Sequence, residues 1–439
     1  MSETPLTERT GYLAAAGLLG DEWTARPYVE VDAAGTIVRT CAGRPADAPP
    51  LVHDLGRCVL LPGMVNAHSH AFQRSIRGAT HRRGEADPSS FWSWREAMYR
   101  AAARMTPEDV FTVSRQCFAE MLRAGVTCVG EFHYLHHTPG GAPYDDPNEL
   151  SRQVLRAAAD VGLRIVLLAV FYARAGEGRP PLPEQRRFCD ASLDAFLARI
   201  DVLRAEGHAI GLAPHSVRAV PLAALRELAA HARAHDLPLH AHVSEQPREN
   251  DECRAEHGLT PTEVFAAAGC FDRPRRFTAV HAIHLTDRDH DLLADQNVCA
   301  CPTTEADLGD GIVPARRHRD RGTNLALGSD SNAVIDLVQE ARLLEMHERL
   351  RDQARLCLAG PDGAVGRTLL DIATVGGARA LGRPELGRLV PGAPFDACTA
   401  DLDHPHLAHL PEEQVLDALM LSGTAAAIDR VFVAGVRRR

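Results

Sequence analysis

The sequence predicts an α/β fold, a (β/α)8 TIM barrel with a small β-sandwich domain built from both chain ends. Three observations predict this fold. Short apolar runs recur eight times along the chain, and segments with helix-start residues lie between them. Polar side chains able to do chemistry stand at the ends of most of these runs. Outside this pattern, both chain ends contain short strand-like segments broken by Gly, Asp and Pro.

The eight apolar runs have the length and character of buried strands. The chain has 439 residues, of which 45% are hydrophobic, so it can bury a large core. Continuous apolar runs bounded by turn residues are typical of strands in a parallel sheet. We expect barrel strands at residues 59–66, 126–131, 164–170, 210–213, 239–243, 278–281, 298–301 and 325–328.

Helix-start residues separate several of these runs. Proline just inside a helix start and acidic residues in the first turn both stabilise a helix N-terminus. We expect helices to begin at Thr106-Pro107-Glu108-Asp109, Val220-Pro221, Thr260-Pro261-Thr262-Glu263 and Thr286-Asp287. Strands that alternate with helices in this way favour a barrel of parallel strands.

The two chain ends are expected to form one small domain beside the barrel. Short strand-like segments occur at residues 28–32 and 35–38, and again at 396–400 and 431–435. The sequence therefore predicts three parts: residues 1–58 in the small domain, residues 59–384 in the barrel, and residues 385–439 in the small domain again.

Composition excludes several classes of protein. No apolar stretch is long enough to span a membrane, and the N-terminus carries acidic residues where a secretory signal would be apolar. Eleven cysteines are scattered without a C-x-x-C motif, which favours reduced thiols and a cytoplasmic location. A net charge of -10 argues against a nucleic-acid partner.

The chain contains no lysine, so all 48 basic residues are arginines. This excludes Schiff-base catalysis, phosphate binding by a Walker-type lysine and a carboxylated lysine that bridges two metals. Any metal site must therefore use His, Asp, Glu or Cys.

Four residues at the predicted strand ends could bind one cation. Side chains alternate along a strand, so His68 and His70 point to the same side. His242 ends the fifth run and Asp330 follows the eighth. Three histidines and one aspartate, with room for water, are typical of a catalytic metal site. The alternatives are His240 in place of His242, and a helix-capping role for Asp330.

Other strand ends carry further candidate residues. Glu131-Phe132-His133-Tyr134 follows the second run, and His215-Ser216-Val217-Arg218 follows the fourth. Glu245 stands three residues after His242, and His281 ends the sixth run, with His284 as its alternative. In a barrel of this kind, these positions all lie at one end.

Two long segments resemble the amidohydrolase superfamily. They are Pro62-Gly63-Met64-Val65-Asn66-Ala67-His68-Ser69-His70 and Gly387-Arg388-Leu389-Val390-Pro391-Gly392-Ala393-Pro394-Phe395-Asp396, together with the later His242, His281 and Asp330. The resemblance implies a hydrolase that acts on non-peptide C–N bonds at a barrel-borne metal. A glutamate three residues after the third metal histidine, without a bridging lysine, resembles the branch of mononuclear deaminases.

Four shorter segments resemble the formimidoylglutamate deiminases of that branch. They are His68-Ser69-His70-Ala71-Phe72-Gln73-Arg74, Phe91-Trp92-Ser93-Trp94-Arg95-Glu96, Glu131-Phe132-His133-Tyr134 and His215-Ser216-Val217-Arg218. The resemblance implies hydrolysis of N-formimidoyl-L-glutamate to N-formyl-L-glutamate and ammonia, a step of histidine degradation. It also implies one divalent metal ion, Zn²⁺, and a cytoplasmic homodimer.

The resemblance assigns roles to individual residues. His68, His70, His242 and Asp330 hold the ion, while Glu245, His281 and Asp330 are catalytic. The substrate is a small dianion, and guanidinium groups bind carboxylates through paired hydrogen bonds. Arg95 and Arg218 are the expected partners, with Arg95 serving its own or a neighbouring subunit. The residues expected to add hydrogen bonds are Gln73, Tyr134 and His215.

Three other functions stay open at this point. A related deaminase would act on an aminated heterocycle such as a purine, pyrimidine or triazine. A different hydrolase would release formamide and glutamate from the same substrate. A catalytically inactive scaffold protein would have lost its ligands, whereas here the whole set is present.

Overall fold

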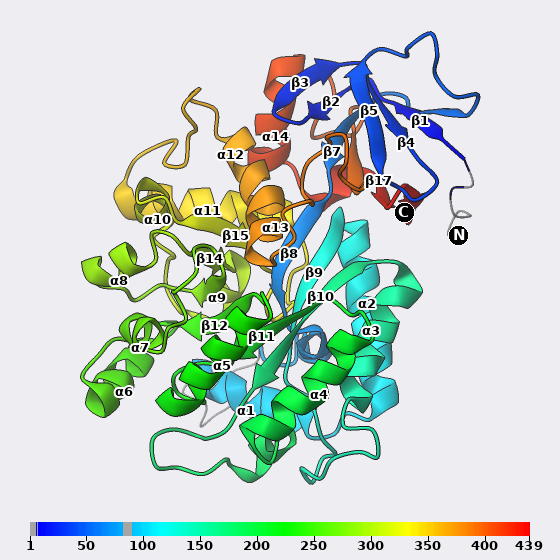
Figure 1. Cartoon of the computed structure of the whole chain (residues 1–439). Helices are drawn as coiled ribbons and strands as arrows, with labels where there is room; N and C mark the ends of the chain where they lie inside the picture. The colour runs from blue at the N-terminus through cyan, green and yellow to red at the C-terminus, as the bar shows by residue number, and fades with distance from the viewer. Residues whose placement is uncertain (1–5, 7, 82–89) are drawn as a thin grey trace.

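The computed structural model describes residues 6, 8–81 and 90–439 and contains the expected barrel. Eight parallel strands lie side by side in chain order (Figure 1). Their bounds are β8 Met64–Ser69, β9 Val126–His133, β10 Arg164–Phe171, β11 Ile210–Pro214, β12 Leu239–Val243, β13 Phe277–His281, β14 Asn297–Ala300 and β15 Asn324–Leu327. The sheet closes where a parallel bridge joins Ser69, at the end of β8, to Asp330, just after β15.

Helices surround the strands, as Figure 1 shows. The longer ones are α1 Phe91–Ala102, α2 Pro107–Arg123, α3 Glu149–Val161, α4 Leu193–Ala205, α5 Leu222–Ala234, α6 Pro247–His257 and α11 Leu337–Asp352. The shorter ones are α7 Pro261–Ala267, α8 Asp287–Leu292, α9 Pro302–Leu308, α10 Ala315–Asp320, α12 Gly366–Asp371, α13 Gly377–Ala380 and α14 Val415–Ser422. The described residues also form the 3₁₀ helices η1 Ala71–Ile76, η2 Pro183–Phe188, η4 Glu412–Gln414 and η5 Ala425–Ala427, and the π-helix η3 Ile372–Gly376.

The predicted helix starts are confirmed, and side chains cap three of them. The hydroxyl oxygens of Thr106, Thr260 and Thr286 each accept a hydrogen bond from the backbone N–H three residues on, at 3.2 Å. Each cap satisfies an N–H that has no partner within its own helix. The fourth predicted start, at Pro221, directly precedes α5.

The first predicted strand is wrong in one respect. The run over residues 59–66 divides at Gly63 into β7 (Cys58–Pro62), which belongs to the small domain, and barrel strand β8. A Cβ at Gly63 would overlap the side chain of Thr127, so only glycine fits where the chain passes from one sheet to the other. The backbone N–H of Gly63 donates to the carbonyl of Asp396 at 2.9 Å.

The small domain contains two sheets, and both chain ends contribute to it, as expected. One sheet has the order β5-β4-β1-β6, with β1 Thr10–Leu13, β4 Pro27–Val31, β5 Ile37–Ala42 and β6 Val52–Asp54. The other has the order β18-β17-β16-β7-β2-β3, with β2 Ala16–Leu19, β3 Glu22–Ala25, β16 Ala397–Asp401, β17 Ile428–Val433 and β18 Val436–Arg437. The rings of Tyr12, Phe395 and Phe432 pack together between the sheets, with centroids 4.6 to 5.4 Å apart.

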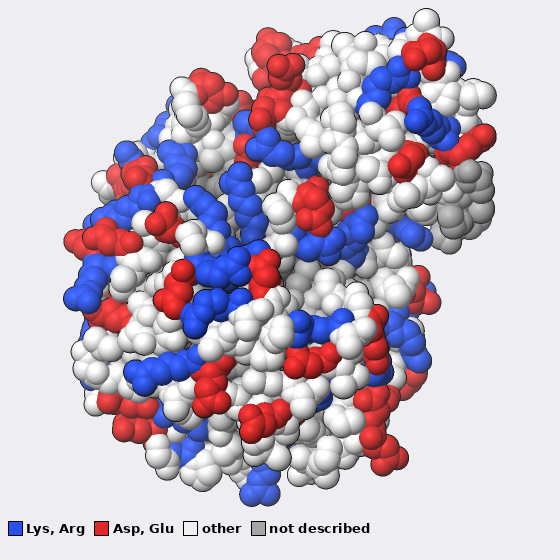
Figure 2. All heavy atoms as spheres, viewed as in Figure 1, with Lys and Arg blue, Asp and Glu red and all other residues white. Residues whose placement is uncertain are grey.

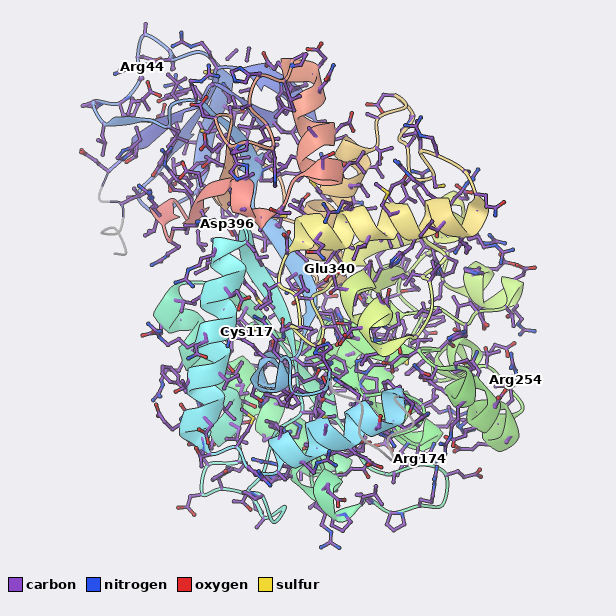
Figure 3. All side chains as sticks on the ribbon, turned by 180° about the vertical axis from the view of Figure 1, so that it is seen from behind. Arg44, Cys117, Arg174, Arg254, Glu340 and Asp396 are labelled. Carbon is purple, nitrogen blue, oxygen red and sulfur yellow. The ribbon has the colours of Figure 1, made fainter. Side chains whose placement is uncertain are left out.

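An ion pair joins the small domain to the barrel. Asp396, labelled in Figure 3 where the two parts meet, is 3% exposed and accepts a hydrogen bond from Arg164 Nη2 at 3.1 Å. The same carboxylate accepts from the backbone N–H of Ala434 at 2.8 Å. One buried carboxylate therefore connects barrel strand β10 with the last strands of the chain.

Charged side chains of both signs are interspersed over the face drawn in Figure 2. Among the described residues, no helix is both long enough and apolar enough to cross a membrane.

Candidate metal centre and active site

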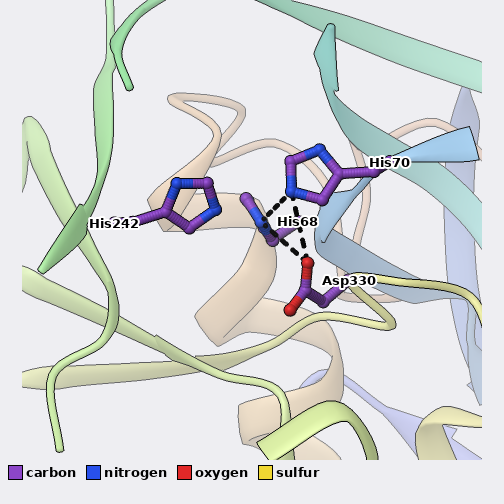
Figure 4. Close-up of side chains that lie close together, drawn as sticks. All are labelled: His68, His70, His242 and Asp330. Atoms are coloured by element: carbon purple, nitrogen blue, oxygen red, sulfur yellow. Dashed lines mark hydrogen bonds and ion pairs between the residues drawn. The ribbon is translucent and has the colours of Figure 1, made fainter. Parts of the chain in front are cut away.

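Four buried side chains converge at the carboxyl end of the barrel strands, as Figure 4 shows. His68 and His70 come from the end of β8, His242 from β12 and Asp330 from the residues after β15. His68 Nε2 lies 3.1 Å from His70 Nε2, and Asp330 Oδ1 lies 3.4 and 3.2 Å from these two atoms. One ligand atom from each of the four residues lies within 4.8 Å of the others.

Hydrogen bonds orient two of these imidazoles. Nδ1 of His70 lies 2.9 Å from the carbonyl oxygen of Phe132, and Nδ1 of His242 lies 3.1 Å from that of His215. Because a carbonyl only accepts, Nδ1 carries the proton in each ring and Nε2 keeps its lone pair. Burial also lowers the pKa of His68 to about 3, and that of His242 well below its usual value. Neutral imidazoles are the form that binds a metal.

These donors fit one divalent ion. Three imidazole nitrogens and one carboxylate oxygen suit Zn²⁺ and other first-row divalent metals. The structure groups His242 with the other three, whereas His240 lies apart, with its Nε2 donating to the carbonyl of Ala380 at 2.9 Å.

The backbone around Asp330 is constrained. Asp330 has φ of 44°, in the left-handed region that few residues other than glycine adopt. A network of buried amides and hydroxyls holds it there: Asn66 Nδ2 donates to Ser329 Oγ at 2.7 Å, and Asn332 Nδ2 donates to the Asp330 carbonyl at 3.1 Å. The carboxylate is thus held at the centre by its own loop.

His281 lies between three carboxylates at the end of β13. Its Nδ1 is 3.2 Å from Glu305 Oε1, while its Nε2 is 3.6 Å from Glu245 Oε1 and 3.7 Å from Asp330 Oδ2. Burial alone would lower the pKa of His281, but these carboxylates raise it well above the usual value. His284 lies apart, with its Nε2 donating to the carbonyl of Asp310 at 2.8 Å.

Glu245 follows β12 and faces the same centre. Its Oε2 accepts a hydrogen bond from Arg218 Nη2 at 3.2 Å, and its backbone N–H donates to Glu249 Oε2 at 3.1 Å. Burial opposes the charge on Arg218, but Glu249 and Glu245 outweigh it and raise the pKa of the guanidinium. Arg218, whose side chain is 11% exposed, is therefore a largely buried and permanent cation beside Glu245.

A cavity opens onto this centre. Its lining includes His70, His242, Glu245 and Asp330, while His68 and His281 are fully buried behind them. The five residues expected to contact a substrate also line it: Gln73, Arg95, Tyr134, His215 and Arg218. Arg95 lines the cavity of its own chain.

Two of these residues contact each other in the lining of the cavity. Gln73 Nε2 donates to the hydroxyl of Tyr134 at 2.9 Å. Gln73 Oε1 is buried and has no hydrogen-bond partner within the described part of the chain. The amide oxygen can therefore accept a hydrogen bond from a ligand.

The cavity also contains residues that the sequence analysis missed. They are Arg179, Arg248 and Glu252. Trp92 and Trp94, which belong to one of the segments that carry the resemblance, line the cavity as well. Arg179 lies in a Gly/Pro-rich loop that follows the third barrel strand, and Arg248 follows the fifth strand. Their position after barrel strands is the signal that could have identified both arginines.

Residues 59–438 match the model of the Amidohydrolase family. A formimidoylglutamate deiminase from Pseudomonas aeruginosa is 40% identical over 430 residues, which cover 96% of this chain and 93% of that protein.

Solved structures of related proteins share the fold of this chain. An amidohydrolase from Brucella melitensis has a TM-score of 0.89 and 37% identity, covering 98% of this chain and 94% of that one. An adenosine deaminase from Xanthomonas campestris with bound zinc has a TM-score of 0.81 and 25% identity, covering 98% and 93%. The chain belongs to the amidohydrolase family.

Proposed function

We propose that this chain hydrolyses N-formimidoyl-L-glutamate to N-formyl-L-glutamate and ammonia, a reaction of histidine degradation in the cytoplasm. One observation carries the proposal. The cavity has the largely buried cation Arg218 and a second guanidinium, Arg95, beside a group of four residues that could hold a metal. Two guanidinium groups suit the two carboxylates of the substrate. The relative with 40% identity is named for this activity.

His68, His70, His242 and Asp330 would hold one divalent ion, which we propose to be Zn²⁺. The zinc-bound adenosine deaminase supports this choice of metal. When bound, such an ion lowers the pKa of water toward 7 and supplies a nucleophile at neutral pH.

Glu245, His281 and Asp330 are the proposed proton-transfer residues. Glu245 takes a proton from the attacking water and passes it to the imino nitrogen of the substrate. It then moves the hydroxyl proton of the tetrahedral intermediate to the same nitrogen, which departs as ammonia. His281 Nε2, within 3.7 Å of both Glu245 and Asp330, orients the attacking water, and Asp330 helps to accept its proton. Glu305 holds the other nitrogen of His281 at 3.2 Å and so fixes the orientation of the ring.

The remaining cavity residues bind the glutamate part of the substrate. Arg95 and Arg218 pair with its carboxylates, and Gln73, Tyr134 and His215 supply hydrogen bonds. The free Oε1 of Gln73 accepts from the substrate N–H, because its amide nitrogen is already directed at Tyr134.

An ammonia-release assay on N-formimidoyl-L-glutamate, with and without a chelator, tests the proposal. Turnover that the chelator abolishes supports it. Adenosine and aminated pyrimidines or triazines serve as competing substrates, and preference for one of these would replace the proposal with a heterocycle deaminase. Formation of formamide and glutamate would instead indicate the alternative cleavage. Absence of turnover on every substrate would indicate an inactive scaffold.

We also propose a homodimer in which each subunit uses its own Arg95, since Arg95 lines the cavity of the chain that carries it. Light scattering measures the mass in solution. Mixing an Arg95→Met variant with a Glu245→Gln variant tests the second point, because activity restored by mixing would show that the site is shared.

A further inference from the structure

We propose that Arg179 and Arg248 form an outer anion-binding subsite at the mouth of the cavity. This subsite receives the carboxylates of a dianionic ligand before Arg95 and Arg218 bind them. The inference rests on the proposed function, because it concerns how the same substrate reaches the same site.

The two arginines occupy the outer part of the cavity. Both line it, and the side chains of Arg179 and Arg248 are each 56% exposed, whereas the side chain of Arg218 is only 11% exposed. They belong to different loops, since Arg179 follows β10 and Arg248 lies in the first turn of α6. The cavity thus has guanidinium groups both at its mouth and at depth.

Glu252 holds the two outer arginines near each other. Its Oε1 accepts a hydrogen bond from Arg248 Nε at 2.9 Å, and its Oε2 lies 3.9 Å from Arg179 Nη2. Arg248 and Glu252 are four residues apart and share one face of α6. A guanidinium group has five N–H donors, so contact with one carboxylate leaves donors for a second anion.

Trp92 connects the outer subsite to the inner one. The Cζ atoms of Arg248 and Arg95 each lie 4.5 Å from the centroid of its ring. Such contacts restrict each guanidinium to the neighbourhood of the indole. An anion that leaves Arg248 therefore meets Arg95 at the same aromatic side chain, so the two subsites are adjacent.

The charge of the lining favours anions. Among the described residues that line the cavity, four arginines face the three carboxylates of Glu245, Glu252 and Asp330, and a bound divalent ion would add to the positive charge. The arginines exceed the carboxylates by one charge, and with the charge of a bound divalent ion the net field attracts anions and speeds their association. A small dianion bound at depth pairs with Arg95 and Arg218. The outer pair, Arg179 and Arg248, remains free to bind an incoming anion.

The test compares Arg179→Gln, Arg248→Gln and the double variant with Arg254→Gln as the matched control. Arg254 is exposed on the same helix, does not line the cavity, and is labelled at the outer edge of the molecule in Figure 3. For the double variant we expect kcat/KM at low ionic strength to fall about 10-fold with little change in kcat. The dependence of kcat/KM on salt should flatten, while Arg254→Gln behaves as the wild type.

A conservative variant separates charge from structure. Arg248→Lys keeps the positive charge, so it should keep most of the salt dependence that Arg248→Gln loses. The proposal is overturned if the double variant retains the wild-type salt dependence, or if its kcat falls as much as its kcat/KM.

A binding measurement distinguishes failure of the outer subsite from failure of the proposed function. The association rate of N-formyl-L-glutamate is followed by tryptophan fluorescence in a stopped-flow instrument, which needs no turnover. A wild-type protein that binds this dianion in a salt-dependent way, but releases no ammonia from N-formimidoyl-L-glutamate, contradicts the proposed function alone. Equal association rates for wild type and double variant contradict the outer subsite alone.

Discussion

His70 and Asp330 are joined both through the backbone and through their side chains. The backbone N–H of His70 donates to the carbonyl of Asp330 at 2.9 Å, and His70 Nε2 lies 3.2 Å from Asp330 Oδ1. The Asp330 N–H in turn donates to the carbonyl of His68 at 3.0 Å. The contacts that close the barrel between its first and last strands therefore involve the same residues as the metal centre.

Removal of the metal should lower the stability of the whole barrel. An ion that binds only the folded chain stabilises it by about 2.7 kcal/mol when its free concentration is 100 times Kd. We expect one ion per chain by elemental analysis, a lower Tm after dialysis against a chelator, and recovery with Zn²⁺. Asp330→Asn should bind little metal and show the same Tm with and without chelator. An unchanged Tm on metal removal from the wild type would contradict this coupling.

Glu245→Gln should keep the metal and lose turnover. The variant preserves the shape of the side chain but cannot transfer a proton, so we expect kcat to fall about 10²- to 10⁴-fold. Glu227→Gln on α5, which is exposed, is the matched control and should retain full activity. Steady-state ammonia release gives kcat, and elemental analysis gives the metal content. Wild-type turnover in Glu245→Gln would remove Glu245 from its proposed role.

Arg218→Met should act mainly on substrate binding. Loss of a charged hydrogen-bond pair costs about 1.5–3 kcal/mol, which corresponds to a rise in KM of about 10- to 100-fold. Because Arg218 also contacts Glu245 at 3.2 Å, kcat should fall as well, but by less. The exposed Arg226→Met is the control. A KM that stays at the wild-type value would rule out the carboxylate assignment.

His318 should make the fold sensitive to acid. Burial, with the neighbouring His290 ring 4.6 Å away, lowers the pKa of His318 from 6.5 to about 3. The folded chain therefore binds this proton less readily than the unfolded chain. Its stabilising effect is present above pH 6.5 and is lost as pH falls toward 3, by up to about 1.4 kcal/mol per pH unit.

His318→Gln should reduce this loss of stability between pH 6.5 and 4. The control is His406→Gln, at an exposed position, which should leave the slope unchanged. Urea unfolding at several pH values measures the free energy of unfolding. If the free energy of unfolding depends on pH in the same way for wild type and His318→Gln, His318 does not cause the acid sensitivity.

Gly63→Ala should destabilise the junction between the two domains. The added Cβ would overlap Thr127, and overpacking of this kind costs about 1–3 kcal/mol. Gly140→Ala, where a Cβ meets nothing within 4 Å, is the control. Thr127→Ala should restore part of the stability lost in Gly63→Ala. A Tm equal to that of the wild type would show that the junction can move apart without cost.

The barrel and the residues at its strand ends could be predicted because their signals are local. The strands are apolar runs, three of the predicted helix starts have a capping Thr, and alternation places His68 and His70 on one side. Residues after parallel strands meet at one end of a barrel, so the fold class placed Asp330 and His242 at that end. The choice between His242 and His240 needed the structure, which groups His242 with the other three residues.

Other features depend on contacts that no local pattern records. The apolar run across Gly63 is continuous, although β7 and β8 belong to different sheets, because both strands are buried. Arg179 reaches the cavity only because its loop folds over α6, where Glu252 lies 3.9 Å away. The sequence shows Arg248 near Glu245, but not that Trp92, more than 150 residues earlier, contacts it.

The pairing of β7 with β16 has a consequence for the order of folding. One edge of Cys58–Pro62 pairs with the nearby β2, but the other edge pairs with Ala397–Asp401, more than 330 residues further along the chain. During synthesis the sandwich must therefore wait until almost the entire polypeptide has left the ribosome. Until then β7 has an unpaired edge directly ahead of His68, so the nascent barrel depends on protection of that edge from aggregation.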